Sequence, residues 1–279
     1  MRDLSKSNEL LSLNTATIKK QWNLEQIIEG CARHQIGAIA PWRDQISECG
    51  LDKASKLIQD AGLRVSGLCR GGMFPAKNNA IFNQNIEENK QAIDEAAKLN
   101  AECLILVVGG LPEKSKDIED ARHQVEDGIA NILDYARASE VPLAIEPLHP
   151  MYAADRACVN TLKQALDICD RLGEGIGVAL DVYHVWWDPE LKTQIERAGK
   201  NKQLLAYHVC DWLVPTTDLL LDRGMMGDGI IELKKIRKWV ENAGYNKTCE
   251  VEIFSANDWW LRPPEEVLEI VISRFHSVV

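Results

Sequence analysis

Polar side chains stand at the ends of several apolar segments of this chain. Glu146 closes the run LAIE, and Asp181 closes GVALD. His208 lies within LLAYHV, and the segment CEVEIF carries Glu250 and Glu252. A carboxylate at the end of a buried segment is costly unless something binds it. Together, Glu146, Asp181, His208 and Glu252 offer three carboxylates and one imidazole, which suit Mn²⁺, Mg²⁺ or Co²⁺ and also accommodate Zn²⁺.

Such a ligand set can support proton transfer on a carbon beside a carbonyl group. A divalent ion chelated by the carbonyl and an adjacent hydroxyl stabilises the enediolate that forms. Epimerisation needs a base on one face of the carbon and an acid on the other. Two glutamates that approach from different strands can bracket that carbon. Aldose–ketose isomerisation and dehydration use the same parts, so the pattern predicts the enediolate stage rather than the product.

The elements that must position these side chains alternate along the whole chain. Eight apolar segments are predicted as strands, namely residues 10–15, 37–42, 64–68, 103–108, 143–146, 177–181, 204–209 and 249–254. Most are continuously apolar, as parallel strands covered on both faces are. Amphipathic helical patterns lie between them, for example over residues 51–61 and 162–172.

Eight strand–helix units predict an α/β fold, a single (β/α)₈ TIM barrel over residues 1–279, with the active site at the C-terminal ends of the strands. The alternative is an open, doubly wound sheet. No glycine-rich phosphate loop follows any of the predicted strands, so the nucleotide-binding versions of that fold lack their usual motif.

Composition narrows the class of protein further. The 279 residues carry a formal net charge of −10, which argues against a nucleic-acid partner. Eight cysteines without any C-x-x-C pair argue against a zinc ribbon. We expect no disulfide framework, because the chain is long enough for a large core and shows no export signal. No apolar run approaches the roughly 18 residues of a membrane span, and no signal core follows the first residues. We expect a reduced, cytoplasmic protein with no membrane partner.

The strand endings IEP, LDxxH, YHVxD and VEIF resemble those of the xylose-isomerase-like sugar isomerase/epimerase superfamily, in particular its ketose 3-epimerase branch. This resemblance implies one divalent ion, with Mn²⁺ the first expectation, held by Glu146, Asp181, His208 and Glu252. It also implies that the two glutamates form the catalytic acid/base pair. Glu250 shares the strand and face of Glu252, so a change of register would exchange the two.

The resemblance also implies residues that bind a sugar or keto-sugar substrate. His184 of the LDxxH motif matches a histidine that contacts substrate oxygens, and Arg223 of DRGMMGDG matches an arginine that contacts substrate near the metal. Trp42 ends the second predicted strand and Arg70 follows the third, so both fall at the active face. For these two residues, substrate contact and packing at the rim both remain open.

Four functions compete on this scaffold. A metal-dependent isomerase or epimerase is the first prediction, and a lyase acting on a keto-inositol or a 3-keto-glycoside is the alternative. An abasic-site endonuclease of the related trinuclear-zinc type needs more histidines than His149, His184 and His208, the three placed near the active face. A non-catalytic sugar-binding barrel does not explain an intact set of four ligands. Self-association is not readable from the sequence.

Overall fold

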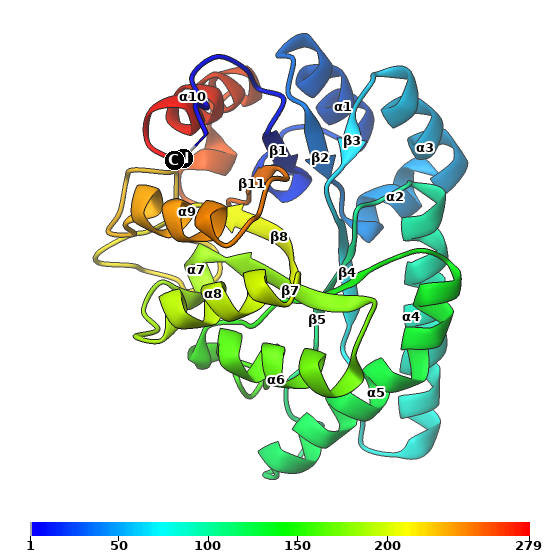
Figure 1. Ribbon diagram of the computed structural model, residues 1–279. Helices are drawn as coiled ribbons and strands as arrows, with labels where there is room; N and C mark the ends of the chain where they lie inside the picture. Colours follow the sequence, from blue (N-terminus) through cyan, green and yellow to red (C-terminus); the bar gives the residue numbers. More distant parts are fainter. Residues whose placement is uncertain (1) are drawn as a thin grey trace.

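A parallel sheet curls into a nearly closed barrel in the computed structural model, which describes residues 2–279 (Figure 1). The strands of this described sheet follow the order β3-β2-β1-β11-β8-β7-β6-β5-β4. Their bounds are β1 Leu11–Asn14, β2 Ala38–Ala40, β3 Arg64–Val65, β4 Leu68–Gly72, β5 Leu104–Val107, β6 Leu143–Ile145, β7 Ile176–Asp181, β8 Leu204–Val209 and β11 Cys249–Val251. Neighbouring strands pair in parallel, so their carboxyl ends share one end of the barrel. The predicted (β/α)₈ fold is confirmed.

The predicted bounds of the third strand, residues 64–68, were wrong. The chain forms two short strands there: β3 pairs with β2, and β4 pairs with β5. A β-bridge joins Trp42, which follows β2, to Cys69 in β4 and brings the barrel close to closure. Arg70 therefore lies within β4 and not after the third strand. The run Arg-Gly-Gly looks like a turn, but a Cβ at Gly72 would lie only 2.0 Å from the Val107 carbonyl oxygen, so glycine is needed there for close packing.

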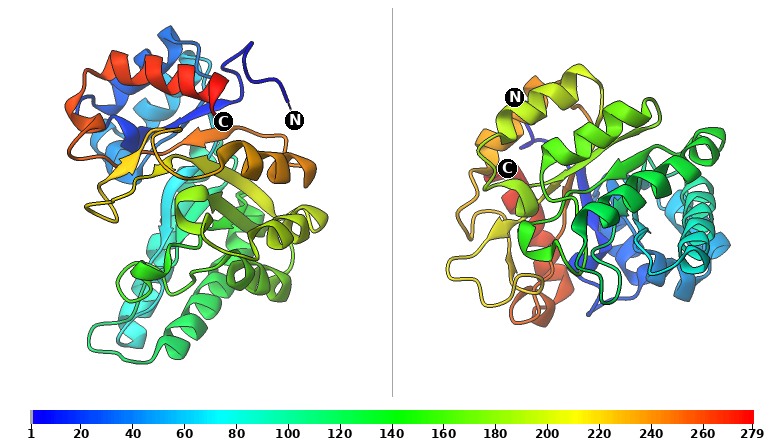
Figure 2. Two further views of the ribbon diagram at one scale, coloured as in Figure 1. Left: turned by 90° about the vertical axis from the view of Figure 1, so that its left-hand side faces the viewer. Right: turned by 90° about the horizontal axis from the view of Figure 1, so that it is seen from below.

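Helices surround the strands on the outside of the barrel (Figures 1 and 2). Their bounds are α1 Leu24–Arg33, α2 Arg43–Cys49, α3 Leu51–Asp60, α4 Asn79–Lys98, α5 Ile118–Ala138, α6 Leu162–Leu172, α7 Val182–Val185, α8 Leu191–Lys200, α9 Leu233–Asn242 and α10 Pro264–Ser277. Capping boxes begin α1 at Asn23 and α6 at Thr161. No helix within residues 2–279 is long and apolar enough to cross a membrane.

Small side chains fill part of the barrel interior. Ala144, Ala179 and Ala206 are buried together with Cys69 and Ile105 in a cluster separate from the main core. Side chains two positions apart on a strand point to the same side. The residue two positions after each of these alanines therefore also faces the interior, one step nearer the carboxyl end.

A short antiparallel pair of strands follows β8 and lies outside the barrel sheet. It consists of β9 (Asp211–Trp212) and β10 (Arg223–Gly224), with Trp212 opposite Arg223. Residues 213–222 connect the two strands, and we call them the capping loop. Drawn in yellow to gold, this loop extends away from the barrel strands (Figure 2). The pair fixes Arg223 at the base of the loop.

Candidate active site

Four buried side chains meet at the carboxyl ends of neighbouring strands. Glu146 directly follows β6, Asp181 ends β7, His208 lies in β8, and Glu252 directly follows β11. Each is at most 6% exposed, and one potential ligand atom from each lies within 4.8 Å of those of the other three. The alternation of side chains explains this, because Glu146, Asp181 and His208 stand two positions after the small interior alanines. The structure therefore brings together the four residues predicted from the sequence.

Two cationic groups balance the carboxylates in this cluster. The Nδ1 atom of His208 lies 3.1 Å from Oε1 of Glu146 and 3.9 Å from Oε2 of Glu252. The Nη1 atom of Arg223 donates to Oδ2 of Asp181 at 2.9 Å and to Oε2 of Glu252 at 3.2 Å. The cluster is therefore an ionic network whose parts are held by strands far apart in the sequence.

Burial and neighbouring charges pull the pKa values of these groups in different directions. Burial raises the pKa of Glu252 to about 8, with Arg223 opposing the rise. Burial would also raise the pKa of Asp181. The positive charge of Arg223 outweighs this effect and lowers the pKa of that carboxyl to about 2. Burial opposes the charged form of His208, yet the carboxylates of Glu250 and Glu146 raise its pKa well above the ordinary value. The site thus holds protons that a bound cation would displace.

The donor set fits a divalent cation. Three carboxylates converge in a buried space where their mutual repulsion calls for positive charge. The Nε2 atom of His208 is buried without a hydrogen-bond partner among residues 2–279, and Oε1 of Glu250 lies 3.6 Å from it. A proton on Nε2 facing this carboxylate would leave Nδ1 free to act as a ligand toward Glu146 and Glu252.

Glu250 lies one step deeper in the barrel than Glu252. Its Oε1 atom accepts from Nδ2 of Asn14 at 2.8 Å, and its Oε2 atom accepts from the Ser66 hydroxyl at 2.8 Å. It lies outside the group of four converging residues, which includes Glu252. The register thus favours Glu252 as the ligand and leaves Glu250 beneath it, facing His208.

The four residues expected to bind substrate line one cavity beside this cluster. Trp42, Arg70, His184 and Arg223 border it together with Glu146 and Glu252. The guanidinium of Arg223 lies 4.4 Å from the centre of the Tyr183 ring. Nδ1 of His184 accepts from the backbone N–H of His149 at 3.2 Å, and burial lowers the pKa of this imidazole to about 4. His184 is therefore a neutral side chain at neutral pH.

Other residues of this cavity were not anticipated. Tyr152, Arg156 and Leu220 also line it, and none of them belongs to a strand ending or a periodic pattern. The hydroxyls of Tyr152 and Tyr183 both donate to the carbonyl of Leu219, the latter at 2.9 Å, which holds the capping loop against the cavity. Such contacts between loops leave no signal in a single sequence.

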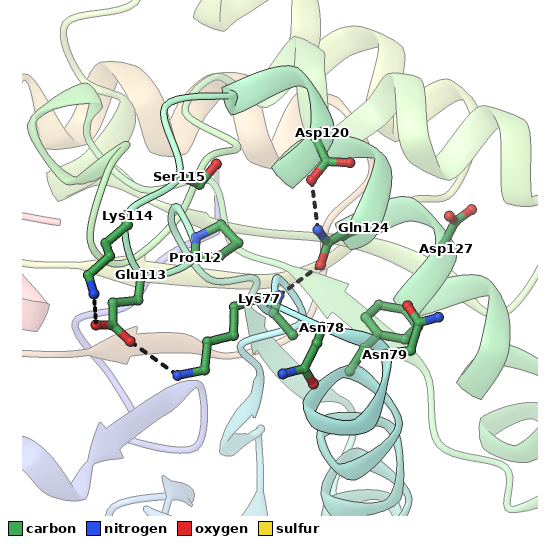
Figure 3. A pocket seen from close by; sticks show the side chains of 12 residues that line it. Lys77, Asn78, Asn79, Pro112, Glu113, Lys114, Ser115, Asp120, Gln124 and Asp127 are labelled. Atoms are coloured by element: carbon green, nitrogen blue, oxygen red, sulfur yellow. Dashed lines mark hydrogen bonds and ion pairs between the residues drawn. The ribbon is translucent and has the colours of Figure 1, made fainter.

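A more open hollow of about 550 Å³ lies between the segments that follow β4 and β5 (Figure 3). Three of its charged groups pair with one another: Nζ of Lys77 lies 3.2 Å and Nζ of Lys114 lies 3.7 Å from the Glu113 carboxylate. The Gln124 amide donates to Asp120 at 2.8 Å. Because these groups already satisfy one another, the hollow offers less chemistry than the smaller, buried cavity.

Comparisons with known proteins agree with this geometry. The model of the xylose isomerase-like TIM barrel family matches residues 28–275. A crystal structure of a protein from Sinorhizobium meliloti 1021 is 57% identical, covers 98% of this chain and 99% of that chain, and superimposes with a TM-score of 0.97. No curated protein sequence matches this chain.

More distant structures share the fold. The IolI protein, solved with a bound zinc atom, is 20% identical with a TM-score of 0.81 and coverage of 96% of this chain and 98% of that chain. A D-allulose 3-epimerase from Methylomonas sp. is 15% identical with a TM-score of 0.77 and coverage of 96% and 97%. At these identities the likeness concerns the arrangement of strands and helices.

Proposed function

Because the chain belongs to the xylose isomerase-like TIM barrel family, we propose that it is a divalent-metal-dependent isomerase or epimerase of a sugar or keto-sugar. The observation that carries this proposal is the buried convergence of Glu146, Asp181, His208 and Glu252 within 4.8 Å. These four residues would hold one ion, with Mn²⁺ preferred for its hard oxygen ligands and Mg²⁺, Co²⁺ or Zn²⁺ as alternatives. When bound, the ion supplies Lewis-acid stabilisation to negative charge developing on substrate oxygens.

The two glutamates are proposed as the groups that move the proton. Glu146 and Glu252 come from β6 and β11, which are separated in the sheet by β7 and β8. Carboxylates on separate strands can approach a substrate carbon from different sides, as epimerisation requires. Without metal, burial raises the pKa of Glu252 to about 8. A bound cation would displace that proton and leave the carboxylate able to accept one from the substrate.

Substrate hydroxyls are proposed to bind His184 and Arg223. Both side chains are buried at the cavity wall, at 3% exposure each, and Nη2 of Arg223 lies 3.1 Å from Nε2 of His184. A neutral imidazole and a guanidinium together offer donors to carbonyl and hydroxyl oxygens. The indole of Trp42 is held by a hydrogen bond from Nε1 to Oδ1 of Asn14 at 2.8 Å and provides a flat wall for a sugar ring.

A reducing, cytoplasmic environment is part of the proposal. The eight cysteines are all free thiols, and all but Cys49 are buried. Burial raises the pKa of the Cys31 thiol to about 12, which keeps it protonated and unreactive. These properties suit a compartment that keeps thiols reduced.

Proton NMR in D₂O tests the proposed reaction. The purified protein is treated with EDTA, reloaded with Mn²⁺, freed of excess ion, and incubated with candidate keto-sugars before the spectrum is recorded. We expect deuterium to enter a carbon beside the carbonyl with the carbon skeleton intact, and we expect the EDTA-treated protein to be inactive. A new alkene or dicarbonyl would instead establish the lyase. Exchange that persists without any metal would overturn the proposal.

A further inference from the structure

Two arginines on the cavity wall make no ion pair with the carboxylates of the ligand cluster. Arg70 lies in β4, and Arg156 lies in the segment after the 3₁₀ helix at Pro150–Tyr152. Arg70 makes no side-chain hydrogen bond or ion pair within residues 2–279. The side chain of Arg156 is 43% exposed and lies 4.0 Å from the carboxylate of its exposed neighbour Asp155. Arg223, by contrast, donates from Nη1 to the Asp181 and Glu252 carboxylates of the ligand cluster.

The positive charge of Arg156 acts on Arg70, and the carboxylates of Glu146 and Glu88 oppose this effect. Burial lowers the pKa of Arg70, and the positive charge of Arg156 lowers it further. Five N–H donors on each guanidinium would need partners once water is excluded. A half-buried cation beside a like charge is unfavourable unless an anion joins the pair. The part of the cavity wall formed by the two arginines therefore carries positive charge on a protein whose net charge is −10.

The two arginines lie in the same cavity as the glutamates proposed to transfer the proton. Glu146 and Glu252 border the same cavity as Arg70 and Arg156, so one small molecule can touch both groups. The planar fork of arginine matches carboxylate and phosphate oxygens in a bidentate geometry. A molecule that places its reacting carbon at the glutamates would present another part of its chain to the arginines.

We propose that the substrate carries an anionic group, a carboxylate or a phosphate, which binds Arg70 and Arg156 while the carbonyl end lies at the metal ligands. The substrate class is then a keto-sugar acid or a sugar phosphate and not a neutral sugar. This inference rests on the proposed function, because it assigns the arginines to the substrate of that reaction.

Calorimetric binding to the Mn²⁺-loaded protein tests the inference without requiring turnover. The probes are 5-keto-D-gluconate, D-fructose 6-phosphate and neutral D-fructose. We expect at least one anionic probe to bind about tenfold or more tightly than D-fructose, since hydrogen bonds between ions are roughly twice as strong as neutral ones. Preference for 5-keto-D-gluconate would identify a carboxylate, and preference for D-fructose 6-phosphate a phosphate.

Matched variants assign the preference to the two arginines. Arg70→Gln and Arg156→Gln should each reduce it about tenfold or more, whereas Arg70→Lys should retain part of it. Arg171→Gln serves as the control, because Arg171 lies on α6 and pairs with Glu126 at 2.7 Å, away from the cavity. Circular dichroism confirms that each variant is folded.

Two results would overturn the inference. The first is that neither anionic probe binds more tightly than D-fructose; the second is that the preference persists in Arg70→Gln and Arg156→Gln. Failure of the proposed function looks different, because anion-selective binding would then remain while no probe exchanges a proton in D₂O. Exchange of neutral D-fructose without anion preference would overturn this inference alone.

Discussion

Replacing Glu252 with glutamine tests the proposed proton transfer most directly. The carboxylate accepts from Nδ2 of Asn14 at 3.0 Å and from Nη1 of Arg223 at 3.2 Å. Glutamine keeps the length and one carbonyl oxygen of this side chain. It loses the ability to accept and return a proton, and its NH₂ group faces a donor on at least one side.

The expected loss follows from the role of the lost group. General acid–base catalysis contributes about 10²–10⁴-fold to a rate, which corresponds to roughly 2.7–5.4 kcal/mol of activation free energy. We therefore expect Glu252→Gln to lower kcat by at least about 10²-fold even when Mn²⁺ is saturating. Metal affinity should fall less, because the amide oxygen remains available to coordinate.

Glu250→Gln supplies the matched control on the same strand and face. Its carboxylate lies 3.6 Å from Nε2 of His208 and holds no place in the group of four ligands. Loss of a partner that orients a metal-binding histidine typically costs 10–100-fold in affinity or activity. We expect weaker Mn²⁺ binding, with kcat restored to within a few-fold of wild type when the metal is saturating.

Initial rates across a Mn²⁺ titration, with affinity measured by calorimetry, separate the two effects. The reasoning is refuted if Glu250→Gln is inactive at saturating Mn²⁺ while Glu252→Gln turns over normally, since the register would then be reversed. Normal turnover in both variants would remove strand β11 from the proton-transfer step altogether.

Further outcomes are expected from metal, pH and packing. His208→Ala should weaken Mn²⁺ binding by calorimetry and leave the far-ultraviolet circular dichroism spectrum unchanged; wild-type affinity would contradict the ligand assignment. Mn²⁺ at 100 times its Kd should stabilise the fold by about 2.7 kcal/mol, or roughly 5–10 °C in Tm, and EDTA should reverse the shift in a thermal melt. Because burial raises the pKa of Glu252 to about 8 and the carboxylates around His208 raise its pKa, both groups are protonated at neutral pH without metal; affinity should therefore rise from pH 6 to pH 9 with release of protons, which calorimetry in two buffers measures. Phe74→Ala, at a fully buried ring, should lower the free energy of unfolding by about 3–5 kcal/mol in urea.

The strand order and the ligand cluster were readable because buried parallel strands have a strong signature. Parallel strands covered on both faces are continuously apolar. The runs before Glu146 and Asp181 follow this rule except for the single acid at their end. That departure marks where binding chemistry lies. The parallel register then brings such points together without further information.

Other features depend on contacts that no local pattern encodes. Residues 64–72 form two strands because the chain changes partner from β2 to β5, and the glycines there serve close packing where the sequence resembles a turn. Arg156 and Leu220 reach the cavity through irregular segments whose positions depend on tertiary hydrogen bonds. The presence of Arg70 and Arg156 on one cavity wall is equally unpredictable, because the two residues belong to segments far apart in the chain.

The hydrogen bonds that hold the capping loop involve its main chain. Tyr152 and Tyr183 both bind the carbonyl oxygen of Leu219, a group that every amino acid possesses. The adjacent side chain of Leu220, which faces the cavity, is free of that task. Mutation at position 220 can therefore alter which substrates fit while the loop keeps its anchor, so this barrel can acquire a new specificity by evolution without first losing the structure that encloses its site.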